Sequence, residues 1–501
     1  MRHHTSIIAL SLLMFSPVYA HVINVLPVPN TLTTFNYKSK KNYDSNLDIL
    51  IIGLEHNSDL INGREGLTSD RASLEQAFST YEPQFSVDAS ANHSLFDKNA
   101  ATTSSAGLSI DLKTKAGTSF NLNPSLNGTT TSKSWGTVTK GSTTYSTSWS
   151  VTQQLLQGST VSVNASDLYN TILTNINNTL SLKDSYNSTA VSLLDNTRQL
   201  RLNLYKQHVY KDNAHMLNQT LKKLELELKN GKKSKIDVVE AKLAIQQQQI
   251  DTSNVTQDIQ NSMNNLTAEM GVSPESTFHL KTDNTHKLPP LKKVDDYIAA
   301  AKKYNITIRQ AAISIEQSEI SLNKSLDALK SSLSLSISGD FNNITNTDMS
   351  LSYSQNLNQS SQKTSVVQNK IAYQKAVRSY IRTESNELAT IKTLYKNLVL
   401  ARQNYALSEK SLQNNKERQN ISRKQFEQGT MSSADYLSNH KSYIDSLVAH
   451  YKSYNVYLKQ YDDFLSKCGI ILEEYNITLA HPVLEYPLDI TKYTARHHSD
   501  T

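Results

Sequence analysis

The sequence contains few of the residues that break secondary structure or cross-link a chain. Its 501 residues include 14 glycines, 10 prolines, 2 tryptophans and a single cysteine. One cysteine excludes an intramolecular disulfide, and Cys468, beside Gly469 and Ile470, is predicted to be a small buried apolar residue. Scarce helix breakers and only 38% hydrophobic residues favour long helices with much exposed surface over a thick core.

Further absences exclude whole classes of function. After the N-terminal segment no run of about 18 apolar residues occurs, so no transmembrane helix is expected. The net charge of +6 is spread along the chain without a basic tract, which argues against nucleic acid as a partner. His208 and His215 lie two turns apart on a predicted helix, too far for a metal pair. The common catalytic and nucleotide-binding motifs are missing, so neither an enzyme nor a cofactor is expected.

The N-terminus is typical of an exported protein. A short basic stretch, MRHHTS, precedes the apolar run IIALSLLMF, and small residues stand at Val18 and Ala20. Residues 1–20 are therefore predicted to be a secretory signal peptide that is cleaved after Ala20. No cysteine follows the predicted cut, so the sequence offers no site for a lipid anchor there.

Two segments have the apolar spacing of long helices. Apolar residues from Val377 to Leu412 step by three, four or seven, and those from Ile444 to Leu465 alternate steps of three and four. This spacing is typical of a coiled-coil seam. No Gly or Pro interrupts residues 363–428, so a helix there could reach roughly 100 Å at about 1.5 Å per residue.

These helices belong to a predicted internal repeat. Three pairs of residues recur at an offset of 198 residues: Gly231 with Gly429, Asp237 with Asp435, and Gly271 with Gly469. A fixed offset over such a span indicates duplication, so a first repeat is predicted over 21–285 and a second over 286–472, with a C-terminal tail over 473–501. Each repeat would contain a long helical hairpin whose tip lies near residue 231 or 429, and the first long helix would cover about 161–229.

Strand pairs with alternating apolar and polar residues precede the long helices. The stretch SLSLSISGD alternates throughout and begins the predicted second-repeat pair 332–358, and the first-repeat pair is QFSVDASAN with TYSTSWSVTQQL. Between the first-repeat strands lies a Ser/Thr/Gly-rich insert, residues 95–143, with the weaker strand patterns GLSIDLK and TSFNLNP. The pattern leaves open whether this insert extends the sheet or forms an outside loop.

The apolar faces of the four main strands need a partner. If they face lipid, four strands cannot close a barrel, because the smallest membrane barrels have about eight. Open sheet edges are excluded in lipid by their unpaired backbone groups. Several copies would then have to build one barrel jointly, with eight strands from two copies or twelve from three. The predicted fold class is mostly α with a membrane β-barrel portion.

The arrangement resembles the TolC family of outer-membrane efflux and secretion channels over about residues 48–472. The resemblance rests on LIIGLEHNSDL leading through Pro83 into the first strand, and on VTQQLLQG at a strand-to-helix exit. It also rests on two turns, NGKKSKIDVVEAK and EQGTMSSADYL, each with a Gly six residues before an Asp. It implies a homotrimer with a 12-strand β-barrel in the outer membrane of a Gram-negative bacterium and a 12-helix α-barrel in the periplasm.

The resemblance also implies the function and the partners. The protein would be the exit duct of a tripartite efflux pump or type I secretion system, surrounded by outer-membrane lipid. Its partners would be a periplasmic adaptor (membrane fusion protein) and an inner-membrane pump of ABC, RND or MFS type. An alternative is an exported trimeric coiled-coil tether or adhesin with a β-strand membrane anchor. The duplicated strand-and-helix order favours the duct, because an adhesin would usually carry its strands at one terminus.

The resemblance assigns two kinds of site to the turns. The hairpin tips, where the adaptor would dock, are marked by Gly231, Gly429 and Thr430. The periplasmic aperture would be formed by six residues near the tips: Asp237, Glu240, Phe426, Met431, Asp435 and Ser438.

In the family, the first-repeat Asp is latched to a Tyr and an Arg of the second repeat. Here the matching positions hold Phe426 and Met431, which cannot form those polar bonds. The second of two pore-facing Asp positions holds Ser438, so a trimer would keep one ring of three Asp435 carboxylates.

The same residues also have ordinary structural interpretations. Asp237 and Asp435 fit the first turn of a helix, where the helix dipole favours acids. The lysines in the first turn motif fit a solvated face, a contact with an acidic adaptor, or a replacement for the missing Arg: Lys232, Lys233 and Lys235. Aromatic residues around the strands fit either a membrane-interface girdle or strand packing: Tyr81, Phe85, Trp135, Tyr145, Trp149, Phe341 and Tyr353.

The alternation in 332–340 makes a testable distinction between neighbouring residues. Leu335 should face lipid and Ser336 the lumen, so Leu335→Arg should cost about 2–4 kcal/mol near the bilayer midplane. Ser336→Arg is the matched control and should be tolerated better. An assay of assembly in the outer membrane compares the two variants, and equal tolerance would refute the assigned faces.

Overall fold

The computed structural model describes most of the residues between 42 and 477. The predicted signal peptide, Trp135 and the tail beyond residue 477 lie outside the described part. The described residues fall within one unit, Ser39–Thr501. They cover the following ranges: 42–43, 46–93, 100–134, 137–278, 280, 288–341 and 343–477.

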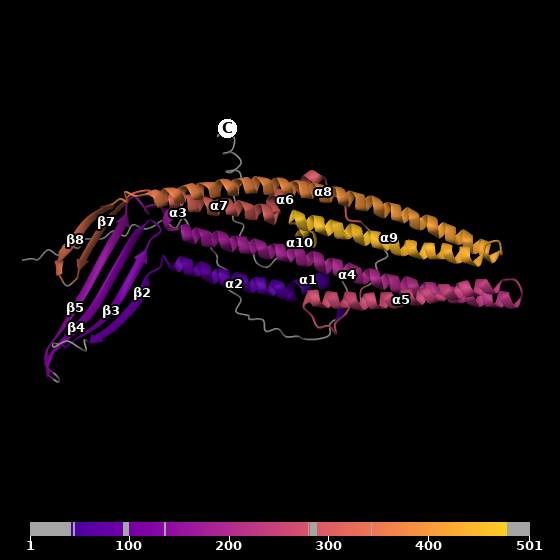
Figure 1. The fold of residues 1–501 in the computed structure, drawn as a ribbon, viewed down its shortest axis with the longest axis horizontal. Helices are drawn as coiled ribbons and strands as arrows, with labels where there is room; N and C mark the ends of the chain where they lie inside the picture. The colour runs from indigo at the N-terminus through magenta and orange to yellow at the C-terminus, as the bar shows by residue number, and fades with distance from the viewer. Residues whose placement is uncertain are drawn as a thin grey trace, which may run out of the picture. The chain divides into compact units, whose positions relative to one another are not determined.

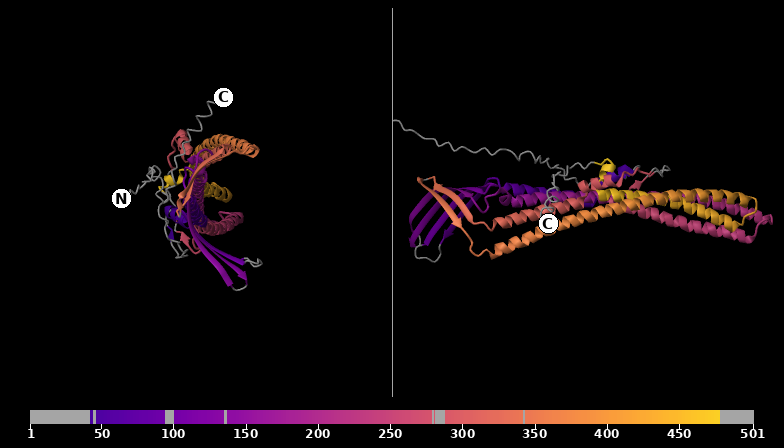
Figure 2. Two further views of the ribbon diagram at one scale, coloured as in Figure 1. Left: turned by 90° about the vertical axis from the view of Figure 1, so that its left-hand side faces the viewer. Right: turned by 90° about the horizontal axis from the view of Figure 1, so that it is seen from above.

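Two long helical hairpins dominate the described part of the chain. The first consists of α4 (Ser166–Lys229) and α5 (Lys235–Met270), and the second of α8 (Ser360–Glu427) and α9 (Ser433–Cys468). The bounds of α5 and α9 differ by 198 residues at both ends. These bounds confirm the predicted long helices and the positions of their turns. Within each hairpin the two helices lie side by side in every view (Figure 1 and Figure 2).

Shorter helices pack against the parts of α4 and α8 nearest the sheet. They are α1 (Asn46–His56), α2 (Ser58–Ser79), α3 (Val161–Asn164), α6 (Val294–Tyr304), α7 (Ile306–Asp327) and α10 (Ile471–Glu474). Helices α1 and α2 are separated by a break at Asn57. The Asn57 side chain caps α2 by accepting hydrogen bonds from the backbone N–H groups of Asp59 and Leu60.

The return helices α5 and α9 end at glycines that no other residue could replace without strain. Gly271 and Gly469 adopt left-handed conformations, with φ of 63° and 79°. A Cβ at Gly271 would overlap the carbonyl oxygen of His56, and one at Gly469 would overlap that of Tyr304. Each return helix therefore ends by packing backbone to backbone against a shorter helix, which fixes where its hairpin docks.

The main core lies where the two hairpins meet the shorter helices. Its fully buried side chains include Leu193 and Leu200 of α4 and Phe464 of α9. The Phe464 ring packs edge-on to Tyr297 of α6, with 4.8 Å between ring centroids. Cys468 is fully buried in the same cluster, as its sequence context predicts.

One buried ion pair crosses between the hairpins inside this core. The guanidinium of Arg198 on α4 donates to the carboxylate of Asp462 on α9, whose side chain has no exposed surface. The Tyr475 hydroxyl donates to the other carboxylate oxygen at 2.9 Å. Burial raises the pKa of Asp462, and the neighbouring Arg198 acts against that rise.

The strands form one antiparallel sheet in which six strands are described. Their order is β2-β3-β4-β5-β7-β8. The strands are β2 (Gln84–His93), β3 (Ala100–Lys113), β4 (Thr118–Ser134), β5 (Thr137–Gln154), β7 (Ser332–Asp340) and β8 (Asn343–Ser354). The sequence pattern predicts only four main strands, and the structure corrects this number. The insert 95–143 supplies β3, β4 and the first part of β5, because its two weak patterns extend into long paired strands. A separate short parallel pair joins β1 (Asn42–Tyr43) to β6 (Thr277–Phe278).

The sheet has one apolar and one polar face along its whole width. Residues opposite each other on antiparallel strands share a face, and the register pairs Leu335 with Leu351 and Ile337 with Val151. Serines pair on the other face, as Ser336 does with Ser350. The predicted alternation in 332–340 is thus present, although which face meets lipid stays a prediction. Among the described helices, none is long and apolar enough to cross a membrane.

The buried ion pair should contribute to stability through the cost of breaking it. Asp462→Ala leaves the Arg198 charge buried without its partner, so it should lower the free energy of unfolding by about 3–5 kcal/mol. Asp445→Ala is the control on the same helix, because its pair with Lys441 is exposed and should contribute less than about 1 kcal/mol. Urea unfolding in detergent, followed by circular dichroism, compares them. Equal losses would contradict a structural role for the buried pair.

Candidate functional site

The two hairpin tips are open turns built around glycine. Gly231 and Gly429 adopt φ of 71° and 77°, and no described atom lies within 4 Å of where a Cβ would stand. The Lys232 N–H donates to the Glu227 carbonyl at 2.8 Å, and the Thr430 N–H donates to the Gln425 carbonyl at 2.9 Å. These bonds end the outgoing helices and leave both tips exposed, as docking tips would need to be.

Behind the glycines, an apolar cluster joins the two tips. Leu224 and Val238 of the first hairpin pack with Phe426 and Tyr436 of the second. The Phe426 and Tyr436 rings stack, with centroids 4.4 Å apart and planes 5° from parallel. Met431 packs against the same cluster. Two predicted aperture residues therefore lie together, in an apolar contact where the family has a polar latch.

Two lysines of the first hairpin stand over the Phe426 ring. The Nζ of Lys233 lies 5.0 Å from the ring centroid, and that of Lys223 lies 5.4 Å away. A cation over an aromatic face contributes about 0.5–1 kcal/mol at an exposed site. Lys233 of the first turn motif thus contacts an aromatic ring of the second hairpin. Its positive charge also contributes to lowering the pKa of Asp237.

Asp237 caps its own helix and also faces the second hairpin. Its carboxylate accepts from the Ser234 hydroxyl at 2.8 Å and the Ser234 N–H at 2.9 Å, and the Ser234 hydroxyl accepts from the Asp237 N–H in return. The pKa of Asp237 is lowered, first by the nearby Ser433 hydroxyl of α9 and then by Ser234. Ser433 is fully buried and approaches without ordinary hydrogen-bond geometry. Asp237 is therefore a capping-box acid at the hairpin contact.

Asp435 has the equivalent capping role in the second hairpin. Its carboxylate accepts from the Ser432 hydroxyl at 2.6 Å, and its N–H donates to the same hydroxyl at 3.1 Å. The Asp435 side chain is exposed, as is Ser438, and Glu240 is half-buried one turn after Asp237. The structure places these three near the tips but does not bring them into one contact. Their role at an aperture stays a prediction.

A buried polar bridge between the hairpins lies behind the tips and was not predicted from the sequence. His440 of α9 donates from Nε2 to Asn213 Oδ1 of α4 at 2.8 Å, and the Asn213 amide donates to Gln248 of α5. Burial lowers the pKa of His440 to about 4, so the ring is neutral near pH 7. The signal available in the sequence is a histidine that follows Tyr436 and precedes Ile444, each by four residues, on the apolar seam.

The described aromatic residues near the strands do not form one group. Phe85, Tyr145 and Tyr353 have exposed rings on the apolar face, and the Trp149 ring lies 6.3 Å from that of Phe341. Tyr81 instead donates its hydroxyl to the Asn164 carbonyl at 2.7 Å, which ties the segment just after α2 to the end of α3. An aromatic girdle stays a prediction for the residues on the apolar face.

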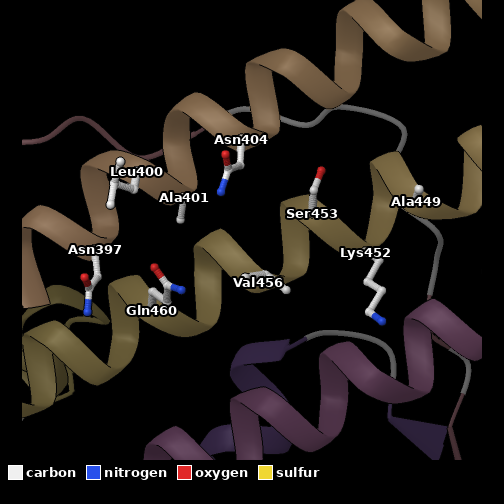
Figure 3. A pocket seen from close by; sticks show the side chains of 9 residues that line it. All are labelled: Asn397, Leu400, Ala401, Asn404, Ala449, Lys452, Ser453, Val456 and Gln460. Carbon is white, nitrogen blue, oxygen red and sulfur yellow. The ribbon is translucent and has the colours of Figure 1, made fainter.

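A shallow open groove runs between α8 and α9, with side chains from both helices (Figure 3). Leu400, Ala401 and Val456 give it an apolar floor, and amide side chains and Lys452 stand at its sides. In the part of the chain that the structure describes, no group of His, Cys, Asp or Glu is placed to hold a metal ion.

Comparison with known proteins identifies the fold of this chain. No family model and no curated protein matches the sequence. The structure is similar to the crystal structure of CusC, a protein described as forming a transmembrane channel. The TM-score is 0.63 and the sequence identity is 12%, and the match covers 88% of this chain and 96% of CusC. It is also similar to the Campylobacter jejuni outer membrane channel CmeC, with a TM-score of 0.61 and 12% identity, and the match covers 90% of this chain and 89% of CmeC. The Vibrio cholerae outer membrane protein VceC is similar with a TM-score of 0.60 and 13% identity, and the match covers 85% of this chain and 96% of VceC.

The chain therefore has the fold of the outer-membrane channel proteins. The resemblance to the TolC family is confirmed at the level of this fold, with hairpins and strands in the same arrangement over most of the chain.

The His440 bridge predicts a loss of stability in acid. Because the folded pKa of about 4 lies below the usual 6.5, the unfolded chain binds the proton more tightly. The contribution of His440 to the free energy of unfolding should be complete above pH 6.5 and should fall by about 3 kcal/mol between pH 6.5 and 4. His440→Gln keeps a donor toward Asn213 and should flatten that dependence.

Urea unfolding at pH 7.5, 5.5 and 4.5 measures this effect. His215→Gln, which changes an exposed histidine of α4, is the control and should keep the wild-type dependence. If His440→Gln lost as much stability in acid as the wild type, the loss would come from other groups.

Proposed function

We propose that the protein is the outer-membrane duct of a tripartite efflux pump or type I secretion system and works as a homotrimer. The observation that carries this proposal is the apolar face of the sheet, in a fold shared with outer-membrane channels. A sheet that turns one continuous apolar face outward needs hydrocarbon or another protein against it.

The exposure of that face supports lipid as its partner. Phe85, Val87 and Met349, from strands at both ends of the sheet, are 69%, 79% and 72% exposed. No described helix or second sheet covers them, and the opposite face is lined by serines and other polar residues. This polarity, apolar outward and polar inward, is that of a wall between lipid and a water-filled lumen.

The edges of the chain support assembly with further copies. Among the described strands β2 and β8 each pair on one side only, so their other sides need partners. The outer helices α5 and α8 also expose apolar side chains at helical spacing: Ile236, Val239, Leu243 and Ile250 on α5, and Leu400, Leu407 and Ile421 on α8. A ring of copies would bring the α5 edge of one against the α8 edge of the next, a heterologous contact that closes by rotation.

At the far end of the hairpins, the proposed aperture and docking tips follow from this assembly. Gly231, Gly429 and Thr430 would contact a periplasmic adaptor, which couples the duct to an inner-membrane pump. Three copies would bring three exposed Asp435 carboxylates around the axis, while Phe426 and Met431 hold the hairpins together by apolar packing. In this scheme the closed state depends on packing more than on polar bonds.

The function is tested by reconstitution of the purified protein in planar bilayers, with native mass measurement of its oligomeric state. We expect a trimer and single-channel currents that trivalent cations block from the periplasmic side, since attraction to the carboxylate ring grows with charge. Asp435→Ala should weaken this block. Phe426→Ala should raise basal conductance more than Asp237→Ala, because it removes the ring at the hairpin contact.

Each outcome has a distinct meaning. A stable monomer with folded strands, or the absence of any conductance, would overturn the duct. If Asp237→Ala opened the pore widely, a polar latch would operate despite Phe426 and Met431. If the cation block survived Asp435→Ala, the ring would lie elsewhere, with Glu240 the next candidate.

A further inference from the structure

We propose that the hairpin β3–β4 is part of the channel wall, so that each copy contributes six strands and a homotrimer closes an eighteen-stranded barrel. The inference rests on the homotrimeric duct proposed above and adds the number of wall strands and the width of the outer opening. It departs from the twelve strands that the family resemblance implies.

The pairing of the hairpin with both neighbours supports a place in the wall. β3 pairs with β2 from Gln84↔Asp111 to His93↔Thr102, along the whole of β2. β4 pairs with β5 from Thr118↔Gln153 to beyond Thr131↔Lys140. A loop lying over the barrel would leave β2 and β5 to pair with each other, whereas here both inserted strands stand between them.

The hairpin also continues both faces of the sheet. On the apolar face, Phe85 of β2 stands opposite Ile110 of β3, Ile110 opposite Leu122 of β4, and Leu122 opposite Trp149 of β5. The alternation therefore passes through the inserted strands without a change of side. Outside the wall, Ile110 and Leu122 would face water on an isolated hairpin that has no core to bury them.

Side-chain hydrogen bonds cross the strand boundaries on the polar face. The Ser86 and Ser109 hydroxyls bond at 2.8 Å between β2 and β3, and the Ser125 and Ser146 hydroxyls at 2.9 Å between β4 and β5. Within the hairpin, the Asn121 amide donates to the Asp111 carboxylate. These groups line the same surface as the serines of β7, so the hairpin presents a polar lining to the lumen.

The turn of the hairpin is seated against the base of the wall. Gly117, with φ of 79°, accepts from the Gln154 N–H at 3.0 Å, and a Cβ there would overlap the carbonyl oxygen of Gly158. The Nζ of Lys115 in the same turn lies 5.7 Å from the centroid of the Tyr81 ring near the end of α2. The turn is thus fitted against the strand-to-helix exit, as a wall strand at its inner end would be.

Adding two strands keeps the assembly able to close. Each pair of neighbours in the order β2-β3-β4-β5-β7-β8 is antiparallel, so β2 and β8 run in opposite directions. The β8 edge of one copy can therefore pair with the β2 edge of the next in the antiparallel manner of outer-membrane barrels. An odd number of inserted strands would have placed parallel edges at this junction.

The consequence is a wider outer opening. Barrel diameter grows roughly linearly with strand number, so eighteen strands give a diameter about 1.5 times that of twelve, in the range where barrels enclose an aqueous channel. The apolar face ends near Leu126 and Tyr145. Beyond it, Thr129 and Thr130 place hydroxyls on both faces of β4, which fits strands that continue past the hydrocarbon.

Adjacent residues of β4 give a direct test. Cys468 is fully buried and burial raises its pKa to about 12, so a newly placed cysteine can be labelled alone. In reconstituted trimers we expect a charged, membrane-impermeant thiol reagent to reduce the current of Asn123→Cys and to leave Leu122→Cys unlabelled. Labelling of both positions with no change in current would place the hairpin outside the wall and overturn the inference.

Counting strands separates this inference from the proposed function. Cryo-electron microscopy of the trimer should show eighteen wall strands, and polymer exclusion from the outer side should give a diameter about 1.5 times that expected for twelve strands. A trimeric channel with twelve wall strands would overturn the inference and leave the duct intact. Failure to find a trimer or a current would overturn the duct itself.

Discussion

Residues that stand opposite each other on antiparallel strands share a face of the sheet, and this constraint joins six segments from distant parts of the chain. Leu335, Val151 and Leu122 lie far apart in sequence, yet the register places them on one surface. Once one strand has an apolar side, its neighbours must carry theirs on the same side. The continuous apolar face, the open edges and the need for further copies all depend on this alternation.

The hairpin tips are held together by contacts of a different chemistry from those of the strands. Phe426 brings the tips together through stacking on Tyr436, and Lys233 and Lys223 cover its ring from the other hairpin. Such contacts are short-ranged and individually weak. A tip held by packing can separate without leaving charged groups unpaired, which suits a contact that must open and close in the proposed function.

Farther from the tips, buried polar groups set how the hairpins are aligned. Arg198 and Asp462 pair across α4 and α9, and His440 reaches Asn213 across the same two helices. A coiled-coil seam alone tolerates a shift of one helix along another, because its apolar contacts repeat. A shift would leave these buried groups without partners, at a cost larger than that of exchanging one apolar contact for another.

Local pattern was enough to determine the long hairpins and the four main strands of this protein. The spacing of apolar residues, the scarcity of breakers, and the turns at Gly231 and Gly429 determined the long hairpins, because 3.6-residue periodicity and glycine turns are local properties. Alternation determined the apolar strand faces for the same reason. The first-turn positions of Asp237 and Asp435 were also predicted, since the preference of a helix N-terminus for acids is a local property.

Only the tertiary structure decided how distant segments combine. The weak strand patterns of the insert became full strands because β2 and β5 supply partners on both sides, and no local window contains that pairing. The contact of Lys233 with Phe426 and the bridge from His440 to Asn213 join residues about 200 positions apart. Their positions depend on how the two hairpins dock, which Gly271, Gly469 and the buried core fix through packing rather than through any pattern along the chain.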